Sequence, residues 1–101
     1  MVWQLVFTQQ YTKRLKRFLR QNPQVRPQYA KTIELLSLNP HHPSLRLHRL
    51  KGNLKTLYSI SINMQHRITI KLIIEDDEII LVNVGSHDTV YPQELMGVMR
   101  P

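Results

Sequence analysis

The spacing of the apolar residues changes at residues 40–44, and this change restricts the chain to a fold that contains both helices and strands. Upstream, apolar side chains recur at helical spacing in two runs: Tyr11, Leu15, Phe18 and Leu19, then Tyr29, Ile33 and Leu36. Downstream, apolar and polar residues alternate at residues 58–62 and 68–74, which is typical of strands. The pattern therefore predicts two amphipathic helices followed by a sheet.

Capping residues and prolines set the bounds of the two predicted helices. Thr8 suits the N-cap of the first helix, and the Asn-Pro pair at 22–23 ends it. Pro27 suits the first turn of the second helix, which continues to the Asn-Pro pair at 39–40. Because the connection is short, the two helices are expected to form an antiparallel hairpin.

Alternating or continuous apolar runs predict five strands, at residues 2–7, 45–51, 58–62, 68–74 and 79–84. The last run is almost wholly apolar, as in a central strand covered on both faces. The acidic residues 75–78 are predicted to form a hairpin tip rather than a metal site. The order β-α-α-β-β-β-β predicts an α+β fold, with an antiparallel (mixed-edge) sheet and the helical hairpin packed on one face.

Length and composition favour a small cytoplasmic domain. The 101 residues fit one domain, 1–101, with residues 92–101 as a C-terminal tail. No apolar run approaches the about 20 residues that cross a membrane, and the N-terminus lacks the features of a signal peptide. The chain has no cysteine, which rules out a disulfide scaffold and thiolate zinc sites.

The positive charge is concentrated in the first half of the chain. The formal net charge is +7, yet residues 1–55 contain eleven basic residues and one acidic residue, whereas residues 56–101 contain three and six. A basic surface favours RNA, DNA or an acidic protein as partner, although a solvated helix face has the same composition. The basic residues expected to contact such a partner are Lys13, Arg14, Lys16, Arg17, Arg20, Arg46, Arg49, Lys51 and Lys55.

The predicted sheet brings polar residues from distant segments to one edge. In an antiparallel sheet, the end of one strand and the start of the next lie at the same edge. Histidine exchanges protons near neutral pH and arginine binds phosphate oxygens, so both fit RNA cleavage by transesterification. The residues expected at this edge are His66, Arg67, His87 and Tyr91, with His48 on the adjoining face.

Each of these residues also has a structural explanation. His66 and His87 can belong to turns, and His48 can simply lie on the polar face of its strand. Arg67 can pair with an acidic residue, and Tyr91 can pack over the end of the sheet. The histidines at 41–42 lack the ligand spacing of zinc sites, so neither a metal nor another cofactor is expected.

Taken together, four segments resemble the RelE/ParE toxin superfamily, and most closely its YafQ/YoeB-like mRNA interferases. They are LHRLKG at 47–52, LYSI at 57–60, HRITI at 66–70 and VGSHDTVY at 84–91. The resemblance implies the toxin of a type II toxin–antitoxin pair, an endoribonuclease that cleaves mRNA at the ribosome by 2′-OH transesterification without a metal. It also implies a small acidic antitoxin as partner, and operator DNA binding by the joint complex.

The resemblance implies a role for each site residue. His87 matches the family's C-terminal catalytic histidine, Tyr91 the aromatic position after it, and Arg67 the arginine that contacts phosphate. His48 matches the histidine of the first motif, and His66 could take the place of a second active-site histidine, so the general base remains open between these two. Two alternatives share the fold: a ParE-like toxin that inhibits DNA gyrase by binding, and an inert domain that only pairs with an antitoxin.

Overall fold

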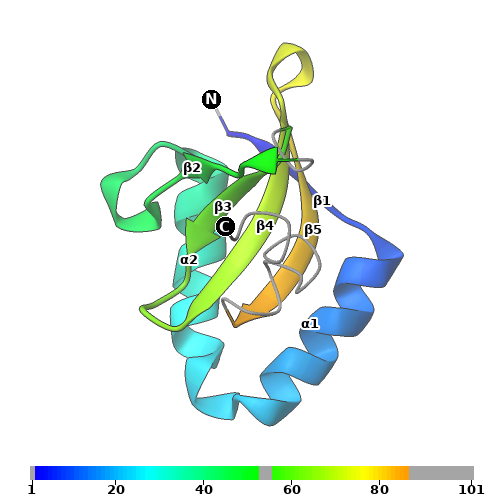
Figure 1. The fold of residues 1–101 in the computed structure, drawn as a ribbon, viewed down its shortest axis with the longest axis vertical. Coiled ribbons are helices and arrows are strands. Elements are labelled where there is room, and N and C mark those ends of the chain that lie inside the picture. Colours follow the sequence, from blue (N-terminus) through cyan, green and yellow to red (C-terminus); the bar gives the residue numbers. More distant parts are fainter. Residues whose placement is uncertain (1, 53–55, 87–101) are drawn as a thin grey trace.

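The computed structural model describes residues 2–52 and 56–86, and within them the chain has the predicted α+β order β-α-α-β-β-β-β (Figure 1). The helices are α1 (Gln9–Gln21) and α2 (Arg26–Leu38). The strands of the mixed sheet are β1 (Gln4–Phe7), β2 (His48–Arg49), β3 (Tyr58–Ser61), β4 (His66–Ile73) and β5 (Glu78–Ser86). Their order is β1-β5-β4-β3-β2, with β1 parallel to β5 and the other pairs antiparallel.

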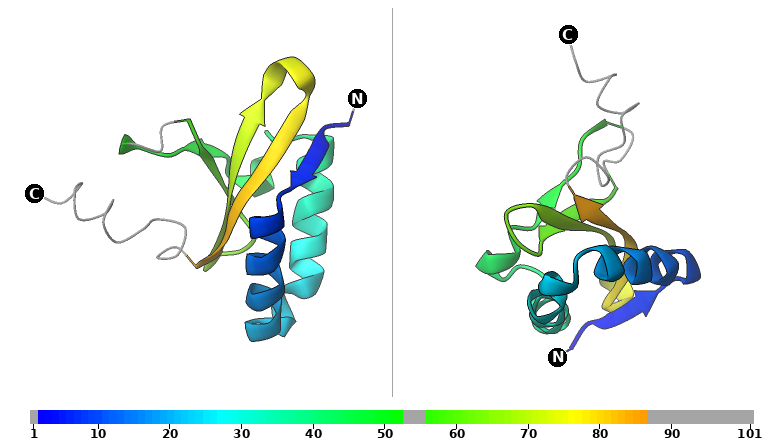
Figure 2. Two further views of the ribbon diagram at one scale, coloured as in Figure 1. Left: turned by 90° about the vertical axis from the view of Figure 1, so that its right-hand side faces the viewer. Right: turned by 90° about the horizontal axis from the view of Figure 1, so that it is seen from below.

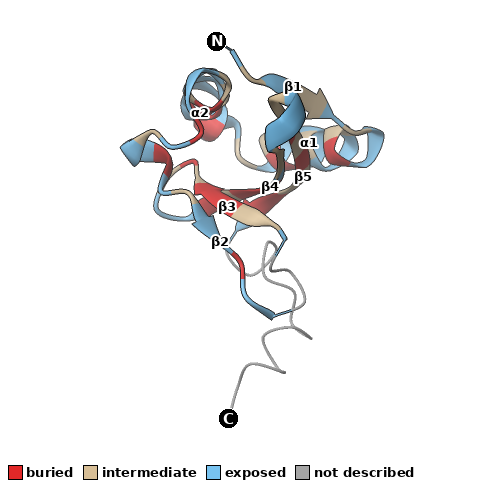
Figure 3. Ribbon diagram, turned by 90° about the horizontal axis from the view of Figure 1, so that it is seen from above, coloured by how far each residue is buried: buried red, intermediate tan, exposed pale blue. Residues whose placement is uncertain are grey.

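Both helices cover one face of the sheet (Figure 2 and Figure 3). The side chain of Thr8 accepts the backbone N–H of Tyr11 at 3.1 Å and so caps the start of α1. At the other end, the backbone and side-chain N–H groups of Asn22 both donate to the carbonyl of Phe18 at 2.9 Å. The predicted ends of α1 are therefore confirmed. Within the described segments, neither helix has the length and apolar character that crossing a membrane requires.

A buried hydrogen bond joins the two helices. The hydroxyl oxygens of Tyr11 and Tyr29 lie 2.8 Å apart, and Tyr11 has no exposed surface. Burial and the neighbouring Tyr29 raise the pKa of Tyr11 far above its usual value, and burial also raises the pKa of Tyr29. Both hydroxyls therefore stay neutral at physiological pH, and the helical hairpin is joined without burying a charge.

A bulge in β5 keeps its apolar side chains in the core. The pairing of β4 with β5 passes from Asn83 directly to Leu81, which leaves Val82 as an extra residue. Leu81 and Val84 are both buried as a result, whereas strict alternation would place Asn83 on the same side as Leu81. The core between helices and sheet consists of Tyr11, Phe18, Val25, Tyr29, Leu36, Leu45, Ile60, Ile62, Ile68, Ile70, Ile79, Leu81 and Val84.

The prediction of a strand over residues 45–51 is wrong in its length. Pro43–Leu45 forms a 3-10 turn, and Arg46 has a left-handed backbone with φ of 51°. The turn is favoured locally because proline starts it and the His42 ring accepts the backbone N–H of Ser44 at 3.1 Å. Only His48–Arg49 pairs with β3.

The acidic residues 75–78 lie at the connection between β4 and β5, as predicted for a hairpin tip. Ile74–Asp76 forms a 3-10 turn, and Asp77 follows with φ of 51°, a conformation that aspartate tolerates. The carbonyl of Asp77 accepts the backbone N–H of Gln4 at 2.8 Å. The tip therefore also fixes the start of β1 beside β5.

Candidate functional site

Two rows of mainly polar residues cross the sheet on the face opposite the helices. Residues paired across adjacent strands point to the same side of a sheet. The row that lies between these two consists of Ile60, Ile68 and Val84, which face the helices and belong to the core. We call the opposite side the polar face, and define it by two rows: His48, Ser59, Thr69 and Asn83, then Ser61, Arg67 and Gly85.

Two hydroxyl groups in the middle of the polar face are buried. Ser59 is 0% exposed and Thr69 is 3% exposed. Within residues 2–52 and 56–86, neither hydroxyl has a hydrogen-bond partner. A buried polar atom without a partner costs about 1–3 kcal/mol, and such atoms are often retained where a ligand completes them. The centre of the polar face therefore contains two unsatisfied hydrogen-bonding groups.

Arg67 lies at the start of β4 and is held by the turn before it. Its Nη1 donates to the carbonyl of Asn63 at 2.6 Å and to the carbonyl of His66 at 3.2 Å. Both bonds use one terminal nitrogen of a guanidinium that carries five N–H donors. The turn thus positions a fixed cation at the end of the polar face, where it can contact a phosphate.

His66 precedes Arg67 but lies on the helix side of the sheet. Its ring packs edge-on against Phe18, with the ring centres 5.0 Å apart, and the residue is 9% exposed. Burial, and secondly the charge of Arg67, lower the pKa of His66 below its usual value. His66 is therefore neutral at pH 7.

The turn also determines which nitrogen of His66 carries the proton. The side-chain oxygen of Asn63 accepts the backbone N–H groups of Gln65 and His66, both at 2.8 Å. The same oxygen lies 3.1 Å from Nδ1 of His66. Because this oxygen acts as an acceptor, Nδ1 is the donor and the lone pair of the neutral ring is on Nε2.

Lowering the pH is expected to destabilise the fold through His66. The pKa of His66 in the folded protein lies below the unfolded value of about 6.5. The contribution of neutral His66 to the free energy of unfolding is therefore complete above pH 6.5. As the pH falls from 6.5 through the folded pKa, the unfolded chain binds the proton first and the free energy of unfolding decreases. Urea titrations between pH 7.5 and pH 5 measure this loss.

His66→Gln should lose less stability over this range than the wild type, whereas the exposed-site control His41→Gln should follow the wild type. Equal slopes for His66→Gln and the wild type would contradict the assignment.

His48 lies on the polar face at the edge of the sheet. Its Nδ1 is 3.1 Å from the carbonyl of Arg46, which can only accept a hydrogen bond. Nδ1 is therefore the donor, and the lone pair of the neutral ring is on Nε2. The left-handed backbone of Arg46 places its carbonyl where the His48 ring can reach it.

The predicted basic residues lie on two separate parts of the surface. On α1, Lys13, Arg14, Lys16, Arg17 and Arg20 line the helix, which contains no acidic residue. Arg46, Arg49 and Lys51 are exposed around β2. The guanidinium of Arg49 lies 5.5 Å from the centre of the Tyr58 ring and donates to its hydroxyl at 3.0 Å. The helix is thus the larger basic surface.

The predicted sheet edge forms as expected, but its residues divide between two faces. Ser61 pairs with Arg67, and His66 with Ser86, so the ends of β3 and β5 lie beside the start of β4. His48 and Arg67 share the polar face, whereas His66 faces the helices. His87, Tyr91, Lys55 and the tail 92–101 lie outside the described residues. Within the described part of the chain, no three His, Asp or Glu side chains are grouped closely enough to hold a metal ion.

Sequence analysis missed three residues that build the site. Asn63 organises the turn that holds both His66 and Arg67, and an asparagine at the start of a tight turn is a recognisable signal for this role. Ser59 and Thr69 have no sequence signal, because their importance comes from being paired across two strands and buried. Their contribution depends on the register of the sheet.

Comparison with solved structures identifies the fold. Escherichia coli YafQ, from strain BL21(DE3), superposes with a TM-score of 0.73 at 15% identity, covering 89% of this chain and 99% of YafQ. The E. coli DinJ-YafQ toxin-antitoxin complex gives 0.73 at 17% identity, with coverages of 91% and 100%. The YoeB-YefM complex from Staphylococcus aureus gives 0.66 at 22% identity, with coverages of 84% and 97%.

These similarities are visible in three dimensions and not in sequence. No family model and no curated protein matches the chain. The structural matches nevertheless cover nearly the whole length of each toxin, and the arrangement of two helices on a five-stranded mixed sheet is common to them. The chain therefore has the fold of the RelE-like toxins, the superfamily that includes YoeB, ParE and YafQ.

Proposed function

We propose that this chain is the cytoplasmic toxin of a type II toxin–antitoxin pair, and that it is an endoribonuclease that cleaves mRNA on the ribosome. The observation that carries the proposal is the polar face, where Arg67 and His48 share one side of a RelE-like sheet around two buried, unsatisfied hydroxyls. The structural relatives YafQ and YoeB occur in complexes with DinJ and YefM, which supports an antitoxin as partner. The net charge of +7 favours an acidic one, and the joint complex is proposed to bind operator DNA.

The proposed reaction needs a base, a cation and an acid, and uses no metal. Nε2 of His48 takes the proton from the ribose 2′-hydroxyl, whose oxygen attacks the adjacent phosphorus. Arg67 stabilises the extra negative charge of the pentacovalent phosphorane. As the bond from phosphorus to the 5′-oxygen breaks, His87 gives that oxygen a proton, and Tyr91 stacks on a base. The products are a 2′,3′-cyclic phosphate and a free 5′-hydroxyl.

The faces of the sheet support His48 rather than His66 as the general base. His48 lies on the same side as Arg67, and its Nδ1–H is fixed by the carbonyl of Arg46. His66 points to the helix side, and its carbonyl accepts a hydrogen bond from Arg67. We therefore assign His66 a positioning role, in which its turn orients the phosphate-binding guanidinium.

Induced expression of the chain tests the proposal. The wild type is expected to arrest translation and to cut mRNA within reading frames, as mapped by primer extension. His87→Ala should abolish cutting while circular dichroism shows an intact fold, and His41→Ala, a histidine outside the site, should cut like the wild type. Intact mRNA together with gyrase-linked DNA breaks would instead indicate a ParE-like toxin, and unchanged cutting by His87→Ala would refute the assigned acid.

A further inference from the structure

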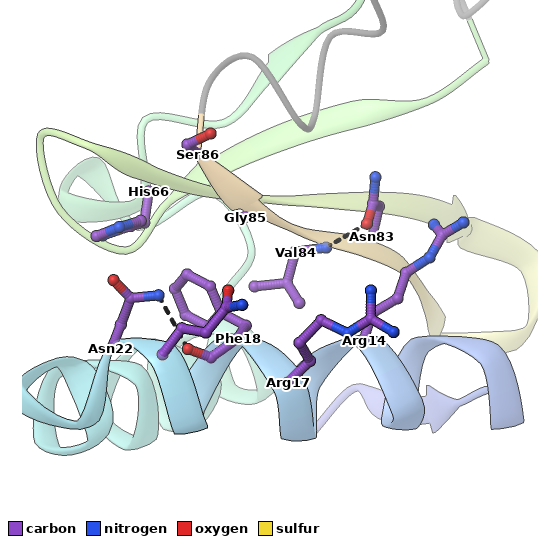
Figure 4. A pocket seen from close by; sticks show the side chains of 10 residues that line it. Arg14, Arg17, Phe18, Asn22, His66, Asn83, Val84, Gly85 and Ser86 are labelled. Carbon is purple, nitrogen blue, oxygen red and sulfur yellow. Dashed lines mark hydrogen bonds between the residues drawn. The ribbon is translucent and has the colours of Figure 1, made fainter.

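A pocket of about 720 Å³ lies between α1 and the end of β5, on the helix side of the sheet. β1 pairs with β5 only as far as Leu81, so among the described strands none borders residues 82–86 on that side. α1 borders this edge instead, and the space between them is the pocket. Figure 4 shows His66 and Asn22 at one end, Arg14 and Asn83 at the other, and Phe18 and Val84 along its length.

The pocket is strongly biased towards anions. Arg14 and Arg17 are one helical turn apart and both line it, and none of the ten lining residues is acidic. The whole of α1 is also free of acidic residues, so no carboxylate within this helix neutralises the two guanidinium groups. Arginine binds a phosphate group through paired N–H donors, so two arginines of one helix that line the same pocket favour a phosphate as ligand.

His66 adds a hydrogen-bond acceptor at one end of the pocket. Nε2 of His66 carries a lone pair, because Nδ1 donates to Asn63, and it can accept a hydrogen bond from a hydroxyl. A ligand with one phosphate and nearby hydroxyl groups would use both kinds of contact.

The volume favours a nucleotide over a single carboxylate. Pockets of about 300–1,000 Å³ enclose ligands larger than an acidic side chain, and this pocket lies within that range. Its position also connects it with the polar face, because Gly85 lines the pocket and pairs with Arg67 on the adjacent strand.

We propose that this pocket is a second RNA site, which binds a backbone phosphate of a single strand between Arg14 and Arg17, separate from the site of cleavage. The inference depends on the proposed function in one respect only, namely that the ligand is RNA. The pocket adds affinity and orients the strand, and it takes no part in the bond-breaking step.

Binding of a non-cleavable RNA tests this site independently of catalysis. The probe is a fluorescent decamer with 2′-O-methyl groups, which cannot undergo transesterification, and its affinity for the purified chain is measured by anisotropy over a range of salt concentrations. The test variant is Arg14→Gln/Arg17→Gln. The matched control is Arg26→Gln/Lys31→Gln, which removes the same charge from exposed positions outside the pocket.

The double pocket variant is expected to bind the decamer at least about 10-fold more weakly. The slope of log affinity against log salt should fall by about 0.7 for each phosphate that the variant no longer neutralises. The control should change affinity by less than about 3-fold.

Equal decreases in affinity for both variants would overturn the site in favour of general charge attraction. If the pocket variant binds RNA as the wild type does but binds a glutamate decamer more weakly, the RNA site is overturned and the pocket binds an acidic protein instead. If the wild type does not cut mRNA in cells, the proposed nuclease activity is refuted. The binding result for the pocket is not affected by that outcome.

Discussion

Arg67→Gln is expected to slow RNA cleavage by about 100- to 1,000-fold, because the variant removes the cation that stabilises the phosphorane. The measurement is the rate at which purified protein cleaves a labelled mRNA on ribosomes under single-turnover conditions. Lys71→Gln is the matched control, since Lys71 lies on the same strand and on the same face, is exposed, and is further from the turn. It should cleave within about 3-fold of the wild type.

The structural role of Arg67 must be separated from its role in cleavage. Its guanidinium holds the turn through the carbonyls of Asn63 and His66, so the variant also loses stability, by about 1.5–3 kcal/mol for hydrogen bonds to a charged group. Assays are therefore made at a temperature where thermal melts show that Arg67→Gln remains folded. Cleavage at the wild-type rate by a folded Arg67→Gln protein would contradict the assignment of the phosphate contact.

Ile68→Ala is expected to lower the free energy of unfolding by about 2–5 kcal/mol, a large part of the stability of a domain of this size. Ile68 is 0% exposed and lies at the centre of the sheet between Ile60 and Val84, so truncation leaves a cavity under the helices. Urea denaturation measures the change. Ile74→Ala is the control, because that side chain is 69% exposed and its truncation should cost less than about 0.5 kcal/mol. Similar decreases for the two variants would show that the core is not where the structure places it.

The helices and the element order could be predicted because their signals are local. Thr8 caps α1 and Asn22 ends it through hydrogen bonds within one turn, and Pro27 lies in the first turn of α2 as its fixed φ requires. The length of β2 could not be predicted from alternation, because the left-handed Arg46 and the 3-10 turn before it interrupt the strand. Likewise, the extra residue Val82 in β5 depends on how the strand pairs with β4.

The edge of the sheet at which the candidate site lies could be predicted from the sequence. The face of the sheet on which each residue lies could not. The strand ends come together as the antiparallel order requires, so Arg67 and His66 lie beside Ser86. Which side each residue occupies depends on the register, and adjacent residues in a strand point to opposite sides. Thus Arg67 shares the polar face with His48, whereas His66 lines the pocket beside α1.

The chemistry of the RNA ends tests the central claim most directly. Purified wild-type protein is incubated with ribosomes programmed with a defined mRNA, and the fragments are analysed by mass spectrometry. Transesterification by the 2′-hydroxyl predicts fragments that end in a 2′,3′-cyclic phosphate and begin with a 5′-hydroxyl, and predicts that Arg67→Gln produces almost none of them. RNA that stays intact with the wild type, or fragments that form equally with both proteins, would contradict a ribonuclease built on the polar face.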